Sequence, residues 1–286
     1  RGDEVLYPNP GYPIYESQIH YQGGIAVPYR YIQTENGFDI DIDSLANSIS
    51  DKTKVLILNN YQNPLSASSS MDELGSLAEL ANKHDLWVLS DDAYYEIRYS
   101  DDDPKSIVNF PGMKERTVVL YTFSKKFAMT GWRVGASIGP LPVIKNMARF
   151  NINDESCTNH FIQHALASML GEKNNYGKEI LDILKRRRNL CLEKLNSIDG
   201  LDVPVPDSTF YLFPNVTDIM RRKGYKNLEK FRIDTVKNTG VAFCTREHFG
   251  SPYQDEEQKY IRLAYSGIDR KNISVGLEKF KTWIIN

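Results

Sequence analysis

Short apolar runs alternate with amphipathic stretches along the first two thirds of this 286-residue chain. Four apolar runs predict strands, and three stretches with apolar residues at helical spacing predict helices. The predicted strands cover residues 54–59, 86–90, 117–121 and 133–138, and the predicted helices cover 71–84, 141–150 and 159–170. This alternation favours an α/β fold, a mostly parallel sheet flanked by helices. The first helix shows its apolar face most clearly, at Leu74, Leu77, Ala78 and Ala81.

The last part of the chain has a different order of elements. A long helix is expected first, at 176–196, and shorter elements follow it. They comprise strands at 209–213, 241–244 and 260–265, a helix at 227–238 and a final helix from residue 270. We therefore expect a large domain over residues 1–175 and a smaller C-terminal α+β domain over residues 176–286.

Composition narrows the class of protein. Hydrophobic residues make up 41% of the chain and charged residues 25%, which is typical of a globular protein with a real core. The net charge of −2 gives no basic field for nucleic acid, and the basic run at 185–188 is expected to be a solvated helix face rather than a binding patch. No apolar run reaches transmembrane length, and the first residues do not resemble a signal peptide.

The three cysteines, Cys157, Cys191 and Cys244, are odd in number and far apart in the sequence. This spacing indicates reduced thiols and favours neither a disulfide framework nor a metal site. A cytoplasmic protein without a metal is therefore expected.

Polar side chains follow three of the predicted strands. Asn63 follows the strand at 54–59, Asp91 follows the strand at 86–90 with Tyr94 three residues later, and Lys125 follows the strand at 117–121. The carboxyl ends of parallel strands lie on one edge of a sheet, where ligands bind, so these side chains are expected to converge. A lysine that is partly desolvated there loses proton affinity and can act as a nucleophilic amine.

Arg133 lies eight residues after Lys125, between two glycines. An arginine beside glycines, where backbone can approach closely, suits a phosphate. A nucleophilic lysine beside a phosphate anchor is what pyridoxal 5'-phosphate (PLP) requires. The carboxylate of Asp91 could then pair with the pyridine nitrogen, while Asn63 and Tyr94 could bond the phenolic oxygen of the ring.

Each of these residues also has a simpler interpretation. Asn63 could belong to a plain Asn-Pro turn, Asp91 could cap a helix or bind Mg²⁺, and Tyr94 could be a packing residue. Lys126 competes with Lys125 as the reactive lysine, and Arg133 could be an ordinary ion-pair partner. Arg262 lies within an apolar strand and therefore needs an anion, which could be a protein carboxylate or a ligand.

The motifs in combination resemble one family. The stretch Ser-Lys-Lys-Phe-Ala-Met-Thr-Gly-Trp-Arg-Val-Gly at 124–135 closely resembles the Schiff-base lysine signature of class I/II aminotransferases, in the fold-type I PLP-dependent family. The resemblance continues in order along the chain. It covers residues 2–13, Asn63-Pro64, Asp91-Asp92-Ala93-Tyr94, Phe210–Pro214 and Ile261-Arg262-Leu263.

The resemblance implies roles for the catalytic residues. Lys125 would form the Schiff base and move the proton, and Asp91 would pair with the pyridine nitrogen. Tyr94 and Asn63 would bond the phenolic oxygen. The implied reaction is ping-pong transfer of an amino group from an L-amino acid to a 2-oxo acid, by a cytoplasmic homodimer.

The resemblance also implies binding roles. Tyr12 would stack on the cofactor ring, and Arg262 would bind the substrate carboxylate, with Asn63 beside it. The phosphate would be held by Thr122, Ser124 and Arg133.

The chain departs from the family pattern in two ways. Family members begin roughly a hundred residues earlier, so the chain resembles a member without its N-terminal part. The loop at 243–250 is bulkier than the family's small Pro-Gly loop, and Arg246 there is expected to form a surface salt bridge rather than to meet a dicarboxylate substrate. A PLP-dependent β-lyase or decarboxylase, or an inactive truncated homologue, remains an alternative to the aminotransferase.

Overall fold

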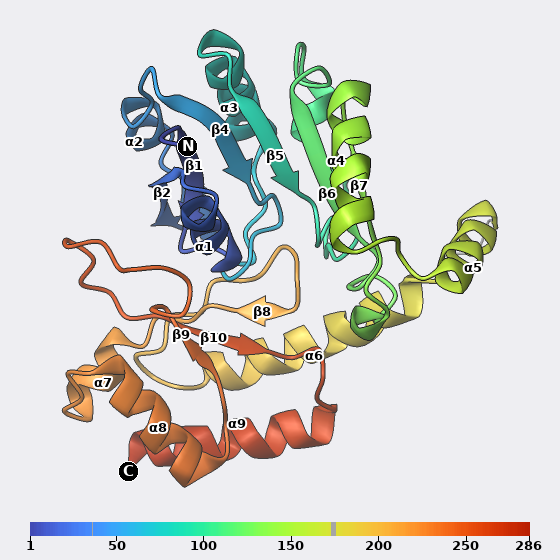
Figure 1. Ribbon diagram of the computed structural model, residues 1–286. Coiled ribbons are helices and arrows are strands. Elements are labelled where there is room, and N and C mark those ends of the chain that lie inside the picture. The colour runs from blue at the N-terminus through green and yellow to red at the C-terminus, as the bar shows by residue number, and fades with distance from the viewer. Residues whose placement is uncertain (36, 173–175) are drawn as a thin grey trace.

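The central feature of the computed structural model is a seven-stranded sheet, which lies above a smaller C-terminal layer in Figure 1. The structure describes residues 1–35, 37–172 and 176–286. The strands are β1 (Glu4–Asn9), β2 (Ile25–Thr34), β3 (Gly37–Ile40), β4 (Thr53–Leu58), β5 (Trp87–Asp91), β6 (Thr117–Thr122) and β7 (Gly135–Ile138). Their order in the sheet is β3-β2-β1-β4-β5-β6-β7.

Strands β2, β1, β4, β5 and β6 run parallel, while β3 and β7 pair antiparallel at the two edges. The predicted α/β fold with a mostly parallel sheet is thus confirmed. The C-terminal ends of the parallel strands meet at one edge of the sheet, and Figure 1 shows the arrowheads of β4 and β5 directed towards the C-terminal layer. The loops that follow these strands therefore lie at the edge of the sheet that faces the C-terminal layer, where ligands bind in open α/β sheets.

In the described part of the chain, five helices connect or flank the strands of this sheet, and two of them, α2 and α3, begin at a side-chain cap. They are α1 (Ile14–Tyr21), α2 (Ile42–Asn47), α3 (Met71–Lys83), α4 (Leu141–Asp154) and α5 (His160–Gly171), with short 3₁₀ turns η1 (Ile107–Asn109) and η2 (Thr130–Trp132). Ser70 and Glu73 form a reciprocal capping box at the start of α3. The predicted apolar face of α3 is buried, as expected, against strands β4 and β5.

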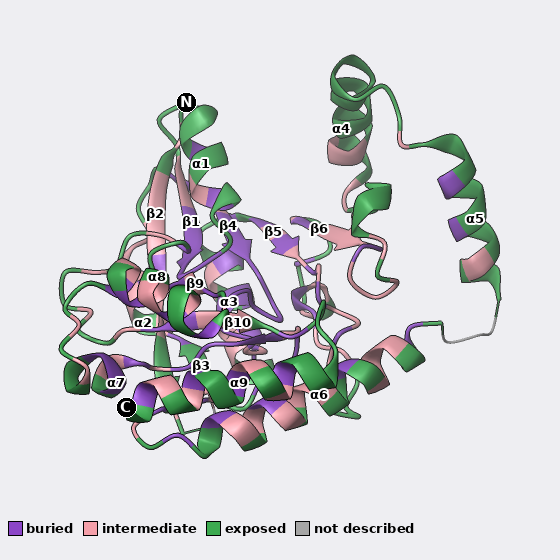
Figure 2. Ribbon diagram, turned by 90° about the horizontal axis from the view of Figure 1, so that it is seen from below, coloured by how far each residue is buried: buried purple, intermediate pink, exposed green. Residues whose placement is uncertain are grey.

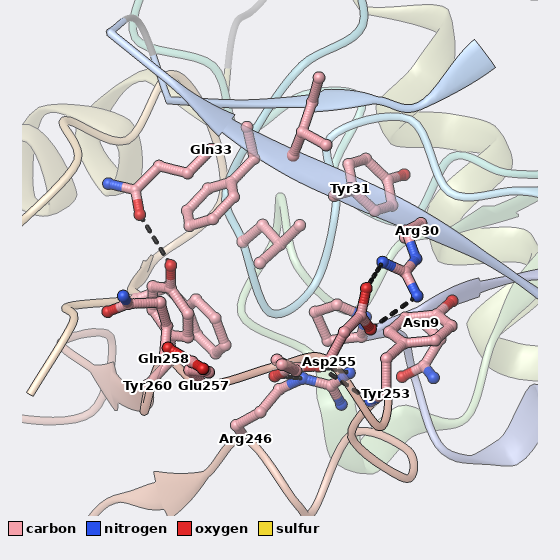
Figure 3. Close-up of a pocket in the computed structure, with 16 residues that line it drawn as sticks. Asn9, Arg30, Tyr31, Gln33, Arg246, Tyr253, Asp255, Glu257, Gln258 and Tyr260 are labelled. Carbon is pink, nitrogen blue, oxygen red and sulfur yellow. Dashed lines mark hydrogen bonds and ion pairs between the residues drawn. The ribbon is translucent and has the colours of Figure 1, made fainter. Parts of the chain in front are cut away.

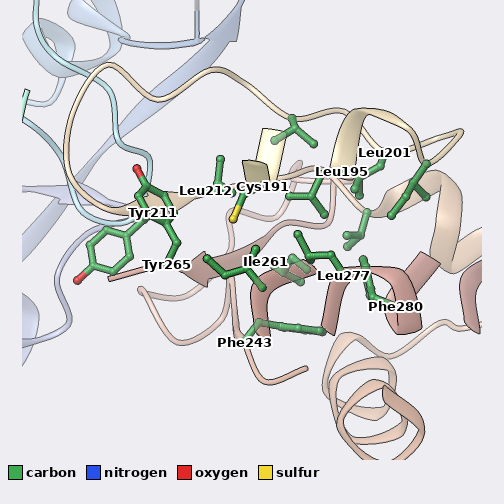
Figure 4. Packing of buried hydrophobic residues seen from close by; sticks show 14 of the residues in the cluster. Cys191, Leu195, Leu201, Tyr211, Leu212, Phe243, Ile261, Tyr265, Leu277 and Phe280 are labelled. Carbon is green, nitrogen blue, oxygen red and sulfur yellow. The ribbon is translucent and has the colours of Figure 1, made fainter. Parts of the chain in front are cut away.

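The C-terminal layer is a small α+β unit, as predicted. It contains α6 (Lys178–Asn196), β8 (Tyr211–Leu212), α7 (Thr217–Arg222), α8 (Leu228–Thr239), β9 (Cys244–Thr245), β10 (Ile261–Ala264) and α9 (Arg270–Ile285). Its strands form an antiparallel sheet in the order β8-β10-β9. Figure 4 shows Leu212 and Ile261 of this sheet in one buried cluster with Leu277 and Phe280 of α9.

The division into domains at 175/176 remains a prediction. Residues 173–175, where the predicted boundary falls, lie outside the described residues. The described chain changes its partners across this gap, because α5 packs against the segment between β6 and β7, at Phe123 and Val134, whereas α6 packs on α9.

Three predicted strands differ from the observed ones by two or more residues at one end, and the other predicted strands agree to within one residue at each end. The strand predicted at 133–138 begins at Gly135, because Arg133 has a left-handed backbone with φ of 53°. The strand predicted at 241–244 is wrong except for Cys244, since the strand β9 covers Cys244–Thr245 and Phe243 instead inserts its ring into the small-unit core. The strand predicted at 209–213 is reduced to Tyr211–Leu212.

The basic run at 185–188 is only partly a solvated helix face. Lys185 and Arg186 are exposed, but Arg187 and Arg188 are half-buried. The guanidinium of Arg188 lies 4.3 Å from the ring centroid of Tyr99 and donates to the carbonyl of Pro206. Arg188 therefore joins α6 to Tyr99 of the large unit. Arg187 bonds the carbonyls of Tyr265 and Ser266 after β10.

Helices α4 and α5 expose many apolar side chains. Figure 2 shows both helices largely exposed, with α5 projecting away from the remainder of the protein. The most exposed of these side chains are Leu141, Phe150, Ile152, Phe161 and Leu170. Within the described residues, no helix is both long enough and apolar enough to cross a membrane.

Candidate active site

The loops after β4 and β5 are joined by an asparagine that sequence reasoning did not single out. Asn59 donates from Nδ2 to the carbonyl of Asp91 at 2.9 Å, and its Oδ1 accepts from the backbone N–H of Asn63 at 3.0 Å. Asn59 is buried, so these bonds fix the two loops firmly relative to each other. The predicted convergence of Asn63 and Asp91 at one edge of the sheet is therefore present in the structure.

Asp91 is held by donors on both carboxylate oxygens. Tyr15 of α1 donates its hydroxyl to Oδ2 at 2.5 Å, and the backbone N–H of Ala93 donates to Oδ1 at 3.1 Å. Burial raises the pKa of Asp91, while these two donors and the charge of Lys125 lower it. Asp91 is thus an oriented carboxylate. Its partners favour the ionised form, whereas its burial disfavours that form.

Lys125 lies in the turn after β6, half-buried, with its Nζ 5.7 Å from the ring centroid of Tyr94. Burial lowers the pKa of Lys125; Asp91 raises it, and the positive charges of Arg133 and Arg262 lower it. A lowered pKa increases the fraction of neutral amine, which is the nucleophilic form. The neighbouring Lys126 instead pairs with Glu96 at 3.0 Å, which favours Lys125 as the reactive lysine.

Arg262 of β10 reaches the same region from the small unit. Its Nη1 donates to Oδ1 of Asn63 at 2.8 Å, and its Nη2 lies 3.7 Å from Sγ of Cys244. Nε is buried and has no hydrogen-bond partner, and across residues 1–35, 37–172 and 176–286 no ion pair to Arg262 is present. Of the two anions that the sequence left open, the structure favours a ligand carboxylate over a protein one.

Tyr94 is buried beneath this site. Its hydroxyl lies 2.7 Å from the hydroxyl of Tyr211 in β8, which is also buried. No site role was predicted from the sequence for Tyr211 or for the nearby Phe249, because aromatic side chains are most often packing residues.

The predicted phosphate anchors are only partly brought together. Thr122 ends β6, and its Oγ1 accepts from the backbone N–H of Ser124 at 3.2 Å. Arg133 is exposed and donates from Nη1 to the carbonyl of Thr130 at 2.8 Å. Thr122 and Ser124 are therefore adjacent, whereas Arg133 contacts neither of them and acts on Lys125 only through its charge.

Tyr12 lies on the Asp91 side of the site. Its ring is 40% exposed and makes an edge-on contact with Tyr15, with centroids 5.8 Å apart. Tyr12, Tyr15 and Asp91 line a cavity of about 540 Å³, whereas Ser124 and Lys125 line another of about 340 Å³. The predicted stacking residue and the predicted Schiff-base lysine thus border different cavities.

A third cavity, of about 350 Å³, lies where the segment 246–258 meets β2 (Figure 3). Arg30 forms a two-point ion pair with Asp255 there, at 2.7 and 2.9 Å, and stacks over Tyr253. Arg246 is 2% exposed and forms a two-point ion pair with Glu256, at 2.8 and 2.9 Å. The prediction that Arg246 forms a salt bridge is right, but the bridge is buried rather than on the surface.

The residues present fit PLP. Burial favours the neutral amine of Lys125, a fixed carboxylate is available at Asp91 for a protonated ring nitrogen, and Tyr94 and Asn63 offer polar groups. The buried and unpartnered Nε of Arg262 is an additional donor for an anion that enters between the two units.

Comparisons with known proteins give the same assignment. A family model described as aminotransferase class I and II matches residues 1–280. The chain is 31% identical over 284 residues to an aspartate aminotransferase of Sulfolobus acidocaldarius, covering 99% of this chain and 69% of the relative. It is 36% identical over 269 residues to an aspartate aminotransferase of Pyrococcus abyssi, covering 93% of this chain and 66% of the relative.

Among solved structures, an aromatic aminotransferase from Pyrococcus horikoshii superimposes with a TM-score of 0.91 at 31% identity. The match covers 99% of this chain and 74% of that structure. The chain spans about two thirds of the length of the curated relatives that it matches. Because the family match extends over nearly the whole chain, the protein belongs to the class I and II aminotransferases, PLP-dependent enzymes of fold type I that transfer amino groups.

Proposed function

We propose that this chain carries the catalytic lysine of a PLP-dependent aminotransferase that moves an amino group from an L-amino acid to a 2-oxo acid by a ping-pong mechanism. The observation that carries the proposal is the position of Lys125. Its amine has a pKa lowered by burial and lies near enough to the fixed carboxylate of Asp91 and to the guanidinium of Arg262 for both charges to act on it; among the described residues Arg262 has no carboxylate partner. When bound, PLP supplies the electron sink for the reaction.

Each residue of the chain has a definite task in this proposal. Lys125 holds the cofactor and carries the proton at its Nζ between two carbon positions of the reactants. Asp91, oriented by Tyr15, keeps the ring nitrogen protonated. Arg262 fixes the α-carboxylate of the substrate, and its bond to Asn63 orients the guanidinium.

The remaining cofactor contacts are part of the same proposal. Thr122, Ser124 and Arg133 hold the phosphate, and Tyr12 stacks on the ring. Tyr94 and Asn63 bond the phenolic oxygen. Arg133 must turn from the carbonyl of Thr130 to reach a phosphate.

Half-reactions test the function directly. The purified protein with PLP is mixed with single L-amino acids, and conversion of the cofactor to its amine form is followed by absorbance, then reversed with 2-oxoglutarate. Reversible conversion that consumes the 2-oxo acid supports the transaminase. Release of ammonia or carbon dioxide without need for a 2-oxo acid would indicate a lyase or a decarboxylase.

We further propose that the protein is cytoplasmic and works as a homodimer. The apolar side chains exposed on α4 and α5 support the proposal of a dimer, since monomeric proteins rarely expose large groups of apolar side chains. Phe150, which is 77% exposed, is expected to be covered in the dimer.

The substitution Phe150→Asp is expected to shift the protein from dimer to monomer, because a buried carboxylate at an apolar interface is unfavourable. Sedimentation velocity at micromolar concentration measures the change. Ile285→Asp is a matched control, since Ile285 is also highly exposed but lies at the end of α9. A monomeric wild type, or dimerisation that Phe150→Asp leaves intact, would contradict the assignment of this surface.

The substitution Arg262→Ala is expected to raise the KM for the amino acid by about 100-fold, because a two-point charged bond to a carboxylate is lost. The affinity for PLP should change less than about twofold. Arg116→Ala is the control, since Arg116 pairs with Asp85 on the surface of the large unit. If the affinity for PLP falls while KM is unchanged, Arg262 binds the cofactor and not the substrate.

The substitution Tyr15→Phe is expected to weaken PLP binding at pH 6 by about tenfold, because it removes a donor to a charged carboxylate. Tyr15 lowers the pKa of Asp91, so its loss raises that pKa and leaves more of Asp91 protonated in mildly acidic solution. The acid limb of the PLP affinity profile should therefore move to higher pH, while affinity at pH 8 changes less. Tyr21→Phe, on the same helix with its side chain in solvent, should leave the profile unchanged.

A further inference from the structure

One residue of the small unit contacts both the predicted substrate-binding arginine and the predicted partner of the cofactor oxygen. Tyr211 in β8 has its hydroxyl 2.7 Å from the hydroxyl of Tyr94. The ring of the same residue lies beneath Arg262, with the guanidinium carbon 4.2 Å from the ring centroid. Tyr211 is 7% exposed and Tyr94 4%, so water does not compete strongly for the pair.

The ring contact restrains the guanidinium of Arg262. A guanidinium over an aromatic ring is attracted by the negative face of the ring, and the attraction is larger when both groups are desolvated. Phe249 adds a second ring, with its centroid 4.6 Å from the guanidinium carbon. Asn63 holds Nη1 from the large unit. The orientation of Arg262 therefore depends on its ring neighbours as well as on its hydrogen bond.

The hydroxyl contact restrains Tyr94. A phenol carries a single proton, so when Tyr94 donates that proton to another acceptor, Tyr211 must be the donor within the pair. A donor on the oxygen of Tyr94 makes the hydroxyl of Tyr94 a stronger donor in turn. Because β8 belongs to the small unit and Tyr94 follows β5, this bond crosses between the two units.

We propose that Tyr211 is a positioning residue that couples the two binding functions: its ring orients Arg262 for the substrate carboxylate, and its hydroxyl strengthens Tyr94 as a donor to the phenolic oxygen of PLP. The proposal rests on the proposed function of the site. The ring and the hydroxyl of Tyr211 have different tasks in this proposal, so a substitution that removes only the hydroxyl can be compared with one that removes both.

Tyr211→Phe removes only the hydroxyl. The visible absorption band of bound PLP is expected to titrate at a higher pH than in the wild type, because Tyr94 becomes a weaker donor to the phenolic oxygen. KM for the amino acid should change less than about twofold, since the ring remains. Tyr211→Leu removes the ring as well, and is expected to shift the band in the same direction and also to raise KM about tenfold.

Tyr265→Phe is the matched control. Tyr265 is also buried, and its hydroxyl forms a similar pair with that of Tyr99 at 2.8 Å; the partners of this hydroxyl are Tyr99 and the carbonyl of Thr209, and neither Arg262 nor Tyr94 is among them. This variant should leave both the band and KM unchanged. The proposed coupling would be overturned if the absorption band of Tyr211→Phe titrates at the same pH as that of the wild type. It would also be overturned if KM rises equally in Tyr211→Phe and Tyr211→Leu.

A measurement without cofactor separates this proposal from the function itself. Urea midpoints of Tyr94→Phe, Tyr211→Phe and the double variant form a thermodynamic cycle for the hydroxyl pair. Additive midpoints would show that the hydroxyls do not interact, and the proposal would fail whatever the protein binds. If the effects of the two substitutions on the midpoint are not additive, the hydroxyls interact. If the wild-type protein nevertheless shows no absorption band of bound PLP, the proposed function is refuted, and the proposed coupling to PLP fails with it although the hydroxyl contact is real.

Discussion

Replacement of Lys125 by alanine is expected to leave the protein unable to attach PLP covalently and to lower transamination by at least about 10⁴-fold. Lys125 lies in the turn after β6, and burial lowers its pKa, which favours the neutral, nucleophilic amine. Its loss removes both the point of attachment and the group that moves the proton. Borohydride reduction of the PLP-loaded protein, followed by peptide mapping, measures the attachment.

Lys126→Ala is the matched control for this prediction. Lys126 is the adjacent residue, and its ion pair with Glu96 is partly exposed, so its loss should change stability and turnover little. A reducible adduct that persists in Lys125→Ala and disappears in Lys126→Ala would show that the two lysines have been assigned in the wrong order. An adduct that persists in both would place the reactive lysine elsewhere.

The apolar runs of the sequence were sufficient to predict β4, β5 and β6 because these strands lie inside the sheet with a neighbouring strand on each side, and most of their residues are buried or half-buried. Strand β2 was not found by its pattern. It is mostly half-exposed and contains Pro28, so it shows neither a continuous apolar run nor a clear alternation. Helix α1 also lacks a signal, since it has eight residues and no side-chain cap.

The candidate site was predictable where chemistry follows a strand. Asp91 is the last residue of β5 and Lys125 lies three residues after the end of β6, so topology alone brings them to one edge of the sheet. The contacts that orient these side chains could not be predicted in the same way, because they join residues far apart in the sequence. Tyr15 lies 76 residues before Asp91, and Tyr211 lies 117 residues after Tyr94. Neither spacing carries a local signal, because such pairs are decided by how the units pack.

The exposed side chain of Arg133 is another feature that the sequence did not predict. Its place between glycines was a reason to expect a phosphate anchor, and its left-handed backbone agrees with a tight turn. The side chain nevertheless bonds the carbonyl of Thr130. A long, exposed side chain moves at small energetic cost, so the local sequence fixes where its backbone lies but not where its guanidinium points.

The substitution Asp91→Asn is expected to lower turnover by roughly 10²–10³-fold while PLP still attaches to Lys125. The amide keeps the size of the side chain but removes the charge that holds a proton on the ring nitrogen, and the cofactor then withdraws electrons less strongly. The loss should fall mainly on kcat, because Arg262 and its contacts with the substrate are unchanged. Stopped-flow absorbance of the first half-reaction measures this rate.

Asp92→Asn provides the comparison that isolates the role of Asp91. Asp92 is the next residue and is also buried, but it accepts from Ser90 and contributes no contact to Asn63, Lys125 or Arg262. Burial raises the pKa of Asp92 to about 7, so a neutral amide there resembles a form that the carboxyl already adopts near neutral pH. Turnover in Asp92→Asn should therefore remain within about threefold of the wild type. Equal losses in the two variants would show that the effect comes from disturbing the loop after β5, and unchanged turnover in Asp91→Asn would remove Asp91 from the ring nitrogen.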